Sequence, residues 1–223
     1  MKKAVLFLNG EIDLLFCESH LYPKSSTNGV ESKTKHHIYC ADGAFLKLID
    51  SPRCIRDLKA IYGDFDSIEL SDLKNIPAHI KVEHLHDQDH TDFEKSLIRL
   101  AENYQHIDIY GVSGQEMDHF LGNISAAMEW RDKVSIRFID TYSEFFIADR
   151  NFSAPGVLGK MISVIPLFEM KSIHYEGLKY TCDGDDLIFG AKIGTRNFAI
   201  KDDIEIKCTQ GKFIVFISHK PYT

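Results

Sequence analysis

The chain lacks the features that mark nucleic-acid-binding, secreted and membrane proteins. It has no lysine-rich run, and 26 Lys and Arg against 33 Asp and Glu give a formal net charge of −7, so nucleic acid is not an expected partner. Its 5 cysteines are scattered and have no C-x-x-C spacing, which argues against a disulfide framework and a zinc site. No apolar stretch is long enough to cross a bilayer, and the one after Met1 is too short for a signal peptide. We therefore expect a protein of the reducing cytoplasm, with no membrane as partner.

What the chain does contain is enough apolar sequence for a real core. Of its 223 residues 44% are hydrophobic, as in an ordinary folded protein with one large or two small domains. In the first half, short β-rich runs alternate with helical stretches, which predicts an α/β domain: a mostly parallel, Rossmann-like sheet with helices on both faces. Apolar residues at helical spacing over 117–128 predict one amphipathic helix. The predicted strands are 4–8, 38–41, 60–62, 80–85, 107–110 and 134–139.

The last part of the chain has a different pattern. After Ser153-Ala154-Pro155-Gly156 the helical period stops, and Asp183-Gly184 and Gln210-Gly211 are typical of hairpin turns. We therefore predict an α/β domain over 1–150 and a small all-β sandwich or barrel domain over 151–223. Because so small a unit buries a low fraction of its surface, we expect it to dock on its own chain or on a partner. The predicted strands are 161–167, 173–180, 187–190, 204–208 and 213–217.

Two carboxylates stand two residues apart in Gly63-Asp64-Phe65-Asp66-Ser67, directly after a predicted strand. In an extended chain Asp64 and Asp66 lie on one face, where ionised carboxylates repel each other unless they share a proton, spread into water or bind a cation. Mg²⁺ commonly takes one or two protein carboxylates and fills its remaining positions with water and substrate phosphates. The pattern thus indicates a magnesium and phosphate site, with an acidic surface turn as the other explanation.

Acidic segments also follow two other predicted strands. Asp42 comes directly after the run at 38–41, and Asp87-Gln88-Asp89-His90-Thr91-Asp92 comes after the run at 80–85. In open α/β sheets, ligands bind outside the carboxyl ends of the strands. We therefore expect these acids to converge with Asp64 and Asp66 in one crevice.

The helix that follows Asp92 allows two roles at its start. Thr91-x-x-Glu94 fits a capping box, and a carboxylate at Asp92 is favoured in the first helical turn by the helix dipole. The same helix start can present N–H groups to a phosphate, with Lys95 adding a positive charge. The capping role and the phosphate role are compatible.

A glycine pair marks the start of the next helix. Gly111-Val112-Ser113-Gly114 allows a tight turn and close backbone approach by a nucleotide, although a plain strand-to-helix turn explains it as well. His119, one of 11 histidines, has the alternative reading of an ordinary helical histidine. We assign no metal role to any histidine.

The order and spacing of these segments resemble the thiamine pyrophosphokinase family. In the last part of the chain, Gly177-Leu178-Lys179-Tyr180 and Gly194-x-x-Asn197 also resemble its β-domain, so the likeness covers almost the full chain. The other matching segments are Ala41-Asp42-Gly43-Ala44, Gly63-Asp64-Phe65-Asp66-Ser67, Asp87-Gln88-x-x-Thr91-Asp92-x-x-Lys95, Gly114-x-x-x-Asp118-His119-x-Leu121-x-Asn123 and Ile162-Ser163-Val164-Ile165-Pro166-Leu167.

The resemblance implies an enzyme that moves a diphosphate group from ATP to the hydroxyethyl oxygen of thiamine and releases AMP. It also implies a homodimer, with the vitamin between the α/β domain of one subunit and the β-domain of the other. The residues it assigns are Asp42, Asp64, Asp66 and Asp92 to Mg²⁺ and catalysis, Gln88, Thr91, Lys95, Gly114, Asp118 and His119 to the ATP side, and Asn123, Arg196 and Asn197 to substrate binding.

Two segments depart from the family's pattern. Gln115-Glu116 stands where relatives commonly have Gly-Arg, so a cation beside the nucleotide has to come from elsewhere in the chain. Arg196-Asn197-Phe198 stands where relatives often have Ser-Asn-Glu facing thiamine. Two other functions stay open: a D-x-D glycosyltransferase that acts on a nucleotide sugar, and a nucleotide or thiamine sensor that keeps the pocket without turnover.

Overall fold

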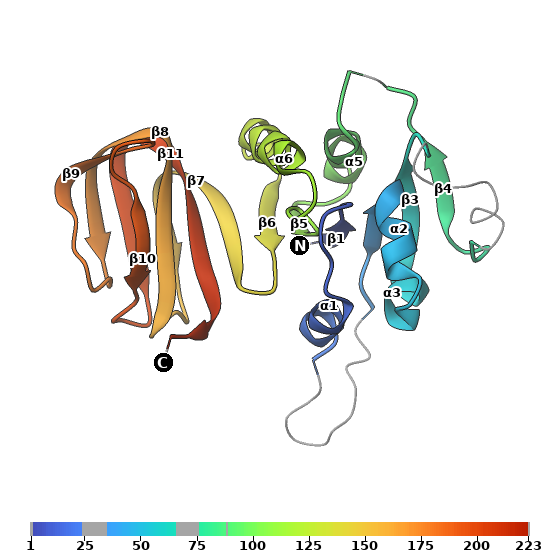
Figure 1. The fold of residues 1–223 in the computed structure, drawn as a ribbon, viewed down its shortest axis with the longest axis horizontal. Helices are drawn as coiled ribbons and strands as arrows, with labels where there is room; N and C mark the ends of the chain where they lie inside the picture. Colours follow the sequence, from blue (N-terminus) through green and yellow to red (C-terminus); the bar gives the residue numbers. More distant parts are fainter. Residues whose placement is uncertain (1, 24–34, 66–75, 88, 223) are drawn as a thin grey trace. The chain divides into compact units, whose positions relative to one another are not determined.

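The computed structural model describes residues 2–23, 35–65, 76–87 and 89–222. The chain forms two compact units, Met1–Asp140 and Thr141–Thr223 (Figure 1). This division falls ten residues before the boundary expected from the sequence, because Ser143–Ala154 is one continuous strand of the second unit. In the described residues, no helix combines the length and the apolar character needed to cross a membrane.

The described part of the first unit contains a parallel sheet in the order β6-β5-β1-β2-β3-β4. The chain adds β2, β3 and β4 on one side of β1 and then returns to add β5 and β6 on the other, so the strand order reverses between β1 and β5. All six strands predicted for this half are confirmed, with ends that differ by at most two residues. They are β1 Lys3–Phe7, β2 Ile38–Ala41, β3 Leu58–Gly63, β4 Lys81–His84, β5 His106–Tyr110 and β6 Ser135–Ile139.

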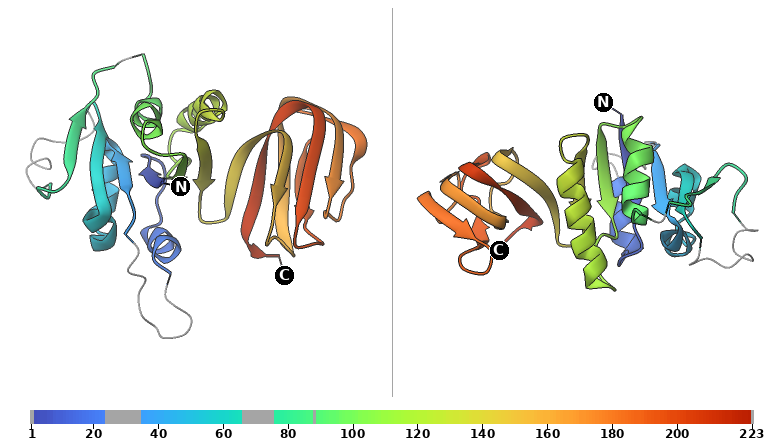
Figure 2. Two further views of the ribbon diagram at one scale, coloured as in Figure 1. Left: turned by 180° about the vertical axis from the view of Figure 1, so that it is seen from behind. Right: turned by 90° about the horizontal axis from the view of Figure 1, so that it is seen from above.

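Helices cover both faces of this sheet, as predicted (Figure 2). Successive residues of a strand point to opposite faces. Ile139 of β6 belongs to the core under the first three helices, whereas its neighbour Phe138 packs on Phe93 of α5 with ring centroids 6.1 Å apart. The helices are α1 Leu14–Leu21, α2 Asp42–Leu48 and α3 Pro52–Asp57 on one face, and α5 Asp92–Ala101 and α6 Met117–Trp130 on the other.

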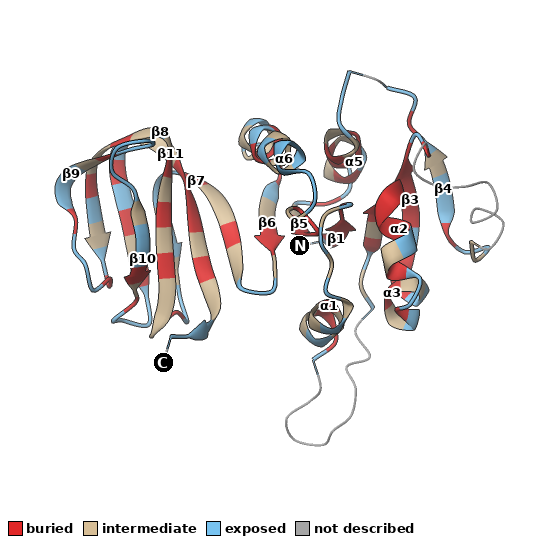
Figure 3. Ribbon diagram, viewed as in Figure 1, coloured by how far each residue is buried: buried red, intermediate tan, exposed pale blue. Residues whose placement is uncertain are grey.

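Burial explains the apolar runs of the sequence. The central strand β1 is buried at every position from Ala4 to Phe7, whereas the edge strand β4 exposes Lys81, Val82 and His84 (Figure 3). A strand covered on both faces needs apolar side chains in both directions and therefore reads as a continuous apolar run. The core on the α1–α3 face includes Phe7, Ile38 and Ile61.

The second unit is all-β, as predicted. Its strands are antiparallel in the order β10-β8-β11-β7, and β9 pairs with β8. Its core includes Ile162, Val164, Phe213 and Val215. Its strands are β7 Ser143–Ala154, β8 Lys160–Glu176, β9 Asp183–Ile188, β10 Gly194–Phe198 and β11 Ile204–Pro221.

Two long strands replace four of the predicted short ones, and the two predicted hairpin turns are wrong. Gln210-Gly211 lies inside β11, where the ladder to β8 shifts register after Gly211. Gly211 has φ 120°, and a Cβ there would lie 2.2 Å from the Glu169 carbonyl oxygen, so only glycine fits this irregular position. Asp183-Gly184 likewise opens β9 rather than ending a strand.

A buried carboxylate at the end of α3 forms hydrogen bonds with the connection from β1 to β2, which contains α1. Asp57, at the end of α3, accepts hydrogen bonds from the Tyr22 hydroxyl at 3.0 Å, the His36 backbone N–H at 3.0 Å and Arg56 Nε at 2.9 Å. Burial alone would raise the pKa of Asp57, but the bonds from Arg56, His36 and Tyr22 outweigh it and hold this pKa below its usual range. The carboxylate thus joins the end of α1 to the entry of β2.

Replacing Asp57 by asparagine should lower the free energy of unfolding at pH 7 by about 1–3 kcal/mol, because buried donors lose a charged acceptor. The folded-state pKa of Asp57 is lowered, so its contribution is present above the unfolded-state pKa of about 3.9 and is lost as pH falls through the folded-state value. Denaturant unfolding of D57N at neutral and acidic pH measures both effects. The exposed D50N is the matched control, and a deficit of D57N that persists unchanged in acid would contradict the assignment.

Candidate active site

A cavity of about 740 Å³ lies at the carboxyl ends of the strands of the first unit. Its walls come from the segments after β1, β2, β3 and β5 and from the first turns of α5 and α6. This is the point where the strand order reverses, the usual ligand position in open α/β sheets. The cavity brings together the following residues named from the sequence: Asp42, Asp64, Thr91, Asp92, Lys95, Gly114, Asp118, His119 and Asn123.

Four other residues named from the sequence are not in this set. Asp66 and Gln88 lie outside the described residues. Arg196 and Asn197 belong to the second unit. One acid from each of the three segments, Asp42, Asp64 and Asp92, lines the cavity, whereas the exposed Asp87 and Asp89 of the third segment do not.

Asp42 is the buried anchor of the acidic turn after β3. It is 3% exposed, and its carboxylate accepts hydrogen bonds from Gly43 N at 2.6 Å and from Phe65 N at 2.8 Å. Phe65 has φ 64°, a left-handed conformation that is costly for a bulky residue and needs such support. A Cβ at Gly63 would lie 2.5 Å from the Asp42 carboxyl group, so glycine is required there. Asp42 thus fixes the direction of the chain at Asp64.

Lys95 balances part of the negative charge of the cavity. Its side chain is 6% exposed, and its Nζ lies 3.2 Å from Asp92 Oδ1 and 3.8 Å from Asp64 Oδ2. Burial raises the pKa of Asp42 above its ordinary value, and the charges of Asp92 and Asp64 add to that rise, while the N–H groups of Gly43 and Phe65 oppose it. The carboxylates together hold more negative charge than one ammonium group neutralises, so a further cation is favoured.

The donor set fits a hard divalent ion. Asp42, Asp64 and Asp92 offer carboxylate oxygens, the ligands that Mg²⁺ prefers. Within the described ranges, no group of three or more His, Cys, Asp or Glu side chains is already arranged as a metal cage. Mg²⁺ does not require one, because it commonly takes one or two protein carboxylates and completes its shell with water and phosphate oxygens.

The two helix starts at the cavity differ in how they are capped. At α5, Thr91 Oγ1 accepts from Glu94 N at 3.3 Å while Glu94 Oε2 accepts from Thr91 N at 2.9 Å, so the predicted capping box is confirmed. At α6, Glu116 is the N-cap residue, and no side chain caps the helix. An uncapped helix N-terminus that lines a cavity can donate backbone N–H groups to a phosphate. The N-terminus of α6 is therefore better suited than that of α5 to bind a phosphate through free backbone N–H groups.

A half-buried lysine that the sequence did not indicate supports the wall of the cavity. Lys47 Nζ of α2 donates to the carbonyl oxygens of Asn9 at 2.5 Å and Gly10 at 2.9 Å. With its amide oriented to satisfy both neighbours, Gln115 accepts from Lys47 Nζ at 2.9 Å and donates to Asn9 O at 3.2 Å. Burial lowers the pKa of Lys47. Lys47 thus brings a cation next to Gln115.

Close backbone packing joins the segments after β1 and β5. Gly10 N donates to Gly111 O at 2.8 Å, and a Cβ at Gly10 would lie 2.3 Å from Ser113 O. Asn123 of α6 donates through Nδ2 to Val112 O at 3.2 Å. Asn123 therefore braces the glycine segment as well as lining the cavity.

Arg196 and Asn197, the two residues of the second unit that were expected to bind substrate, lie in different surroundings. Arg196 lines a cavity of about 490 Å³, and its guanidinium lies 5.4 Å from the centre of the Tyr222 ring, in a cation–π contact. Asn197 is 6% exposed, accepts from Tyr180 N at 2.9 Å and donates to Tyr180 O at 2.7 Å. Asn197 therefore positions the Tyr180 segment rather than facing that cavity.

Comparison with known proteins points to one family. Residues 30–139 match the family described as thiamin pyrophosphokinase, catalytic domain, and residues 149–213 match thiamin pyrophosphokinase, vitamin B1 binding domain. Thiamin pyrophosphokinase 1 of Caenorhabditis elegans is 28% identical over 227 aligned residues, which cover 91% of this chain and 84% of the relative. Thiamine pyrophosphokinase of Bacillus subtilis is 27% identical over 143 residues, 61% of this chain and 67% of the relative.

Solved structures share the fold. Thiamin pyrophosphokinase from Candida albicans superposes with a TM-score of 0.78 at 18% identity, covering 97% of this chain and 88% of that one. Thiamin pyrophosphokinase from Geobacillus thermodenitrificans gives a TM-score of 0.76 at 18% identity, with 98% of both chains covered. The two matched domain families fall on the two compact units and together span most of the sequence. The chain therefore belongs to the thiamin pyrophosphokinase family.

Proposed function

We propose that this chain is an ATP-dependent thiamine diphosphokinase, which forms thiamine diphosphate and AMP. The observation that carries the proposal is the meeting of Asp42, Asp64, Asp92 and Lys95 in one cavity at the switch point of the sheet, in a chain of this family. Carboxylates for a metal and cationic groups for phosphates are what transfer of a phosphoryl-type group requires.

The reaction makes one bond and breaks one. The hydroxyethyl oxygen of thiamine bonds to the β-phosphorus of ATP, the bond from that phosphorus to the α,β-bridging oxygen breaks, and AMP leaves with that oxygen. The hydroxyl proton passes to a carboxylate of the cavity within hydrogen-bond reach. The protein's share is mainly positioning and neutralisation of charge, with no covalent intermediate.

The acidic residues would hold Mg²⁺. We assign this role to the four named acids, and Mg²⁺, when bound, would neutralise charge on the transferred phosphates. Asp42 has the additional task of orienting Asp64, since its carboxylate holds the backbone N–H of Phe65. The four acids are Asp42, Asp64, Asp66 and Asp92.

The nucleotide would lie along α5, α6 and the glycine segment. The uncapped start of α6 offers N–H groups to phosphate oxygens, and Lys47 and Lys95 contribute positive charge from two sides. Glu116 does not oppose this strongly, because its side chain is 72% exposed and lies 3.7 Å from His119 Nε2. The residues assigned to the nucleotide side are Gln88, Thr91, Lys95, Gly114, Asp118 and His119.

Thiamine would be bound with the help of the second unit in a homodimer. The match of residues 149–213 to a vitamin B1 binding domain supports this part of the proposal. The Arg196 guanidinium lies over the Tyr222 ring, a cation–π contact that holds its position while it keeps its positive charge. Asn123 and Asn197 would position the neighbouring segments. All five cysteines are free and buried, which supports a reducing compartment such as the cytoplasm.

The two alternatives fit the chain less well. A glycosyltransferase would use the D-x-D pair, but neither matched domain family is of that class. A sensor without turnover, suggested by Glu116 and Arg196, would keep the same pocket and differ from the enzyme only in forming no product, but both curated relatives carry the name of an enzyme. The enzyme is therefore preferred.

Incubation of the purified chain with ATP, Mg²⁺ and thiamine should yield AMP and thiamine diphosphate in equal amounts. Chromatography of the products measures both, and omission of Mg²⁺ or addition of a chelator should stop their formation. Formation of ADP, or binding of both substrates without product, would reject the reaction in favour of another kinase or the sensor.

Replacing Asp64 by alanine should lower kcat by about 100-fold or more, because the site loses a carboxylate that would hold the Mg²⁺ needed to neutralise the reacting phosphates. The thermal midpoint should not fall, since the change also relieves carboxylate repulsion. D89A removes an exposed acid from the segment before α5 and is the matched control, expected to keep wild-type kcat. Unfolding of D64A, or full activity in it, would contradict the assignment.

Replacing Lys47 by methionine should raise KM for ATP by about tenfold or more, because hydrogen bonds from a charged donor contribute about 1.5–3 kcal/mol. KM for thiamine should stay near the wild-type value, since the contacts of Lys47 are with Asn9, Gly10 and Gln115 at one wall. Steady-state kinetics with each substrate varied in turn separates the two constants. K59M, on the exposed part of β3, is the control, and equal change in both constants would point to a general loss of structure.

A further inference from the structure

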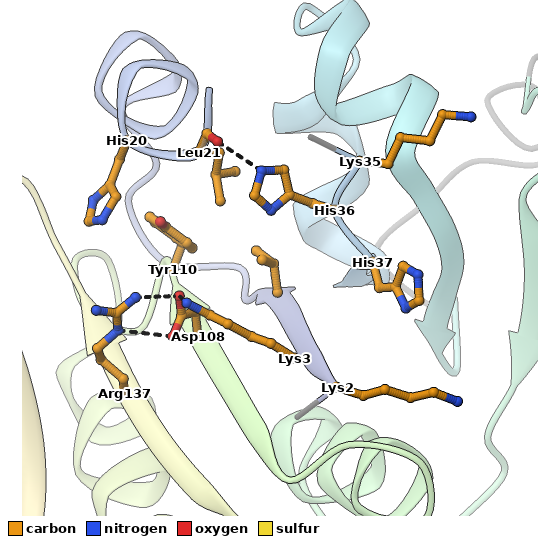
Figure 4. A pocket seen from close by; sticks show the side chains of 11 residues that line it. Lys2, Lys3, His20, Leu21, Lys35, His36, His37, Asp108, Tyr110 and Arg137 are labelled. Carbon is orange, nitrogen blue, oxygen red and sulfur yellow. Dashed lines mark hydrogen bonds and ion pairs between the residues drawn. The ribbon is translucent and has the colours of Figure 1, made fainter. Parts of the chain in front are cut away.

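A second cavity of the first unit, of about 500 Å³, lies on the face of the sheet that α1 covers (Figure 4). It shares no lining residue with the candidate active site. The cavity is bounded by the first residues of β1, the entry of β2, the middle of β5 and β6, and the end of α1. A ligand in it would therefore lie outside the candidate active site.

The sheet presents charged side chains to this cavity where an apolar core would be expected. Asp108 of β5 is 5% exposed and is the register partner of Arg137 on β6. Its carboxylate accepts from Arg137 Nε at 2.9 Å and from the Arg137 terminal nitrogen at 2.6 Å, and Lys3 pairs with it from β1. Figure 4 shows Lys3 and Arg137 converging on Asp108. Two cations thus share one anion.

Positive charge dominates the lining as a whole. Among the described residues that line it, four are cations, Lys2, Lys3, Lys35 and Arg137, and one is a carboxylate, Asp108, in a chain whose formal net charge is −7. Lys3 and Arg137 point to Asp108, whereas Lys2 and Lys35 extend away from it (Figure 4). Three histidines add ring nitrogens, and His36 Nε2 already donates to Leu21 O at 2.8 Å. In a concave site with apolar walls, an excess of positive side chains produces a focused positive electrostatic potential, which favours binding of anions.

One buried hydroxyl in this cavity lacks a partner. Tyr110 is 1% exposed, lines the cavity, and its hydroxyl has no hydrogen-bond partner among the residues that the structure describes. Its ring is held in place by stacking on Phe7, with centroids 5.1 Å apart. A buried hydroxyl without a partner costs about 1–3 kcal/mol, so a ligand oxygen that accepts from it would be favoured.

We propose that this cavity binds a small organic phosphate. The Tyr110 hydroxyl donates to the phosphate, and Lys3, whose side chain is 47% exposed, turns toward it while Arg137 keeps Asp108 paired through two hydrogen bonds. A phosphate dianion matches the surplus of positive charge better than a single carboxylate does. A volume of about 500 Å³ is in the range of small-molecule sites and exceeds what inorganic phosphate fills.

Calorimetric titration of the full chain with AMP, without Mg²⁺ or thiamine, tests the proposal. Wild-type protein should bind AMP at two sites. K95M, in the candidate active site, should weaken one of them, and Y110F and K3Q should each weaken the other by about tenfold or more, equivalent to about 1.4 kcal/mol. Y110F keeps the ring that packs on Phe7, so it preserves the core.

Titration with inorganic diphosphate separates the two sources of a phosphate group. Loss of AMP affinity at one site in Y110F and K3Q supports the proposal that this cavity binds an organic phosphate. If inorganic diphosphate binds at this cavity and AMP does not, the proposal is overturned. Two AMP sites that both survive in Y110F and K3Q, or a single site abolished by K95M, also overturn it. Failure of the proposed reaction would instead appear as missing product in the turnover assay, whatever binds here.

Discussion

Repulsion between carboxylates at the strand ends is the constraint on which the candidate site depends. Asp42, Asp64 and Asp92 face one cavity, and the buried ammonium of Lys95 neutralises only part of their charge. The backbone is built to keep them there: Gly63 leaves room for the Asp42 carboxyl group, which in turn holds Phe65 in a left-handed conformation. Such a site is stabilised by a cation and by the phosphates that accompany it.

The sequence predicted the parts of this arrangement that depend on local pattern. Strands buried on both faces read as apolar runs, so all six strands of the first unit were located, and the capping box at Thr91 was identified from its spacing. The convergence of the acids followed from a general property of parallel sheets, in which the carboxyl ends of the strands share one edge. That argument needs only strand positions and no side-chain geometry.

Features that depend on tertiary contacts were not predictable in the same way. Lys47 stands in an ordinary helix, and only the fold brings it to Asn9 and Gln115. Gln210-Gly211 has the composition of a turn, but β11 pairs with β8 both before and after these residues. The chain therefore shifts register there and does not reverse direction. Asn197 matched a substrate-facing motif, yet both ends of its side-chain amide form hydrogen bonds with the backbone of Tyr180. Each case is decided by a partner distant in sequence.

The most direct test of the account is the affinity for Mg²⁺ of protein saturated with a non-hydrolysable ATP analogue, measured by titration calorimetry. The account predicts that replacing Asp64 or Asp92 by asparagine weakens Mg²⁺ binding by about tenfold or more each, while D89N leaves it unchanged. Equal Mg²⁺ affinity in wild type, D64N and D92N would contradict it.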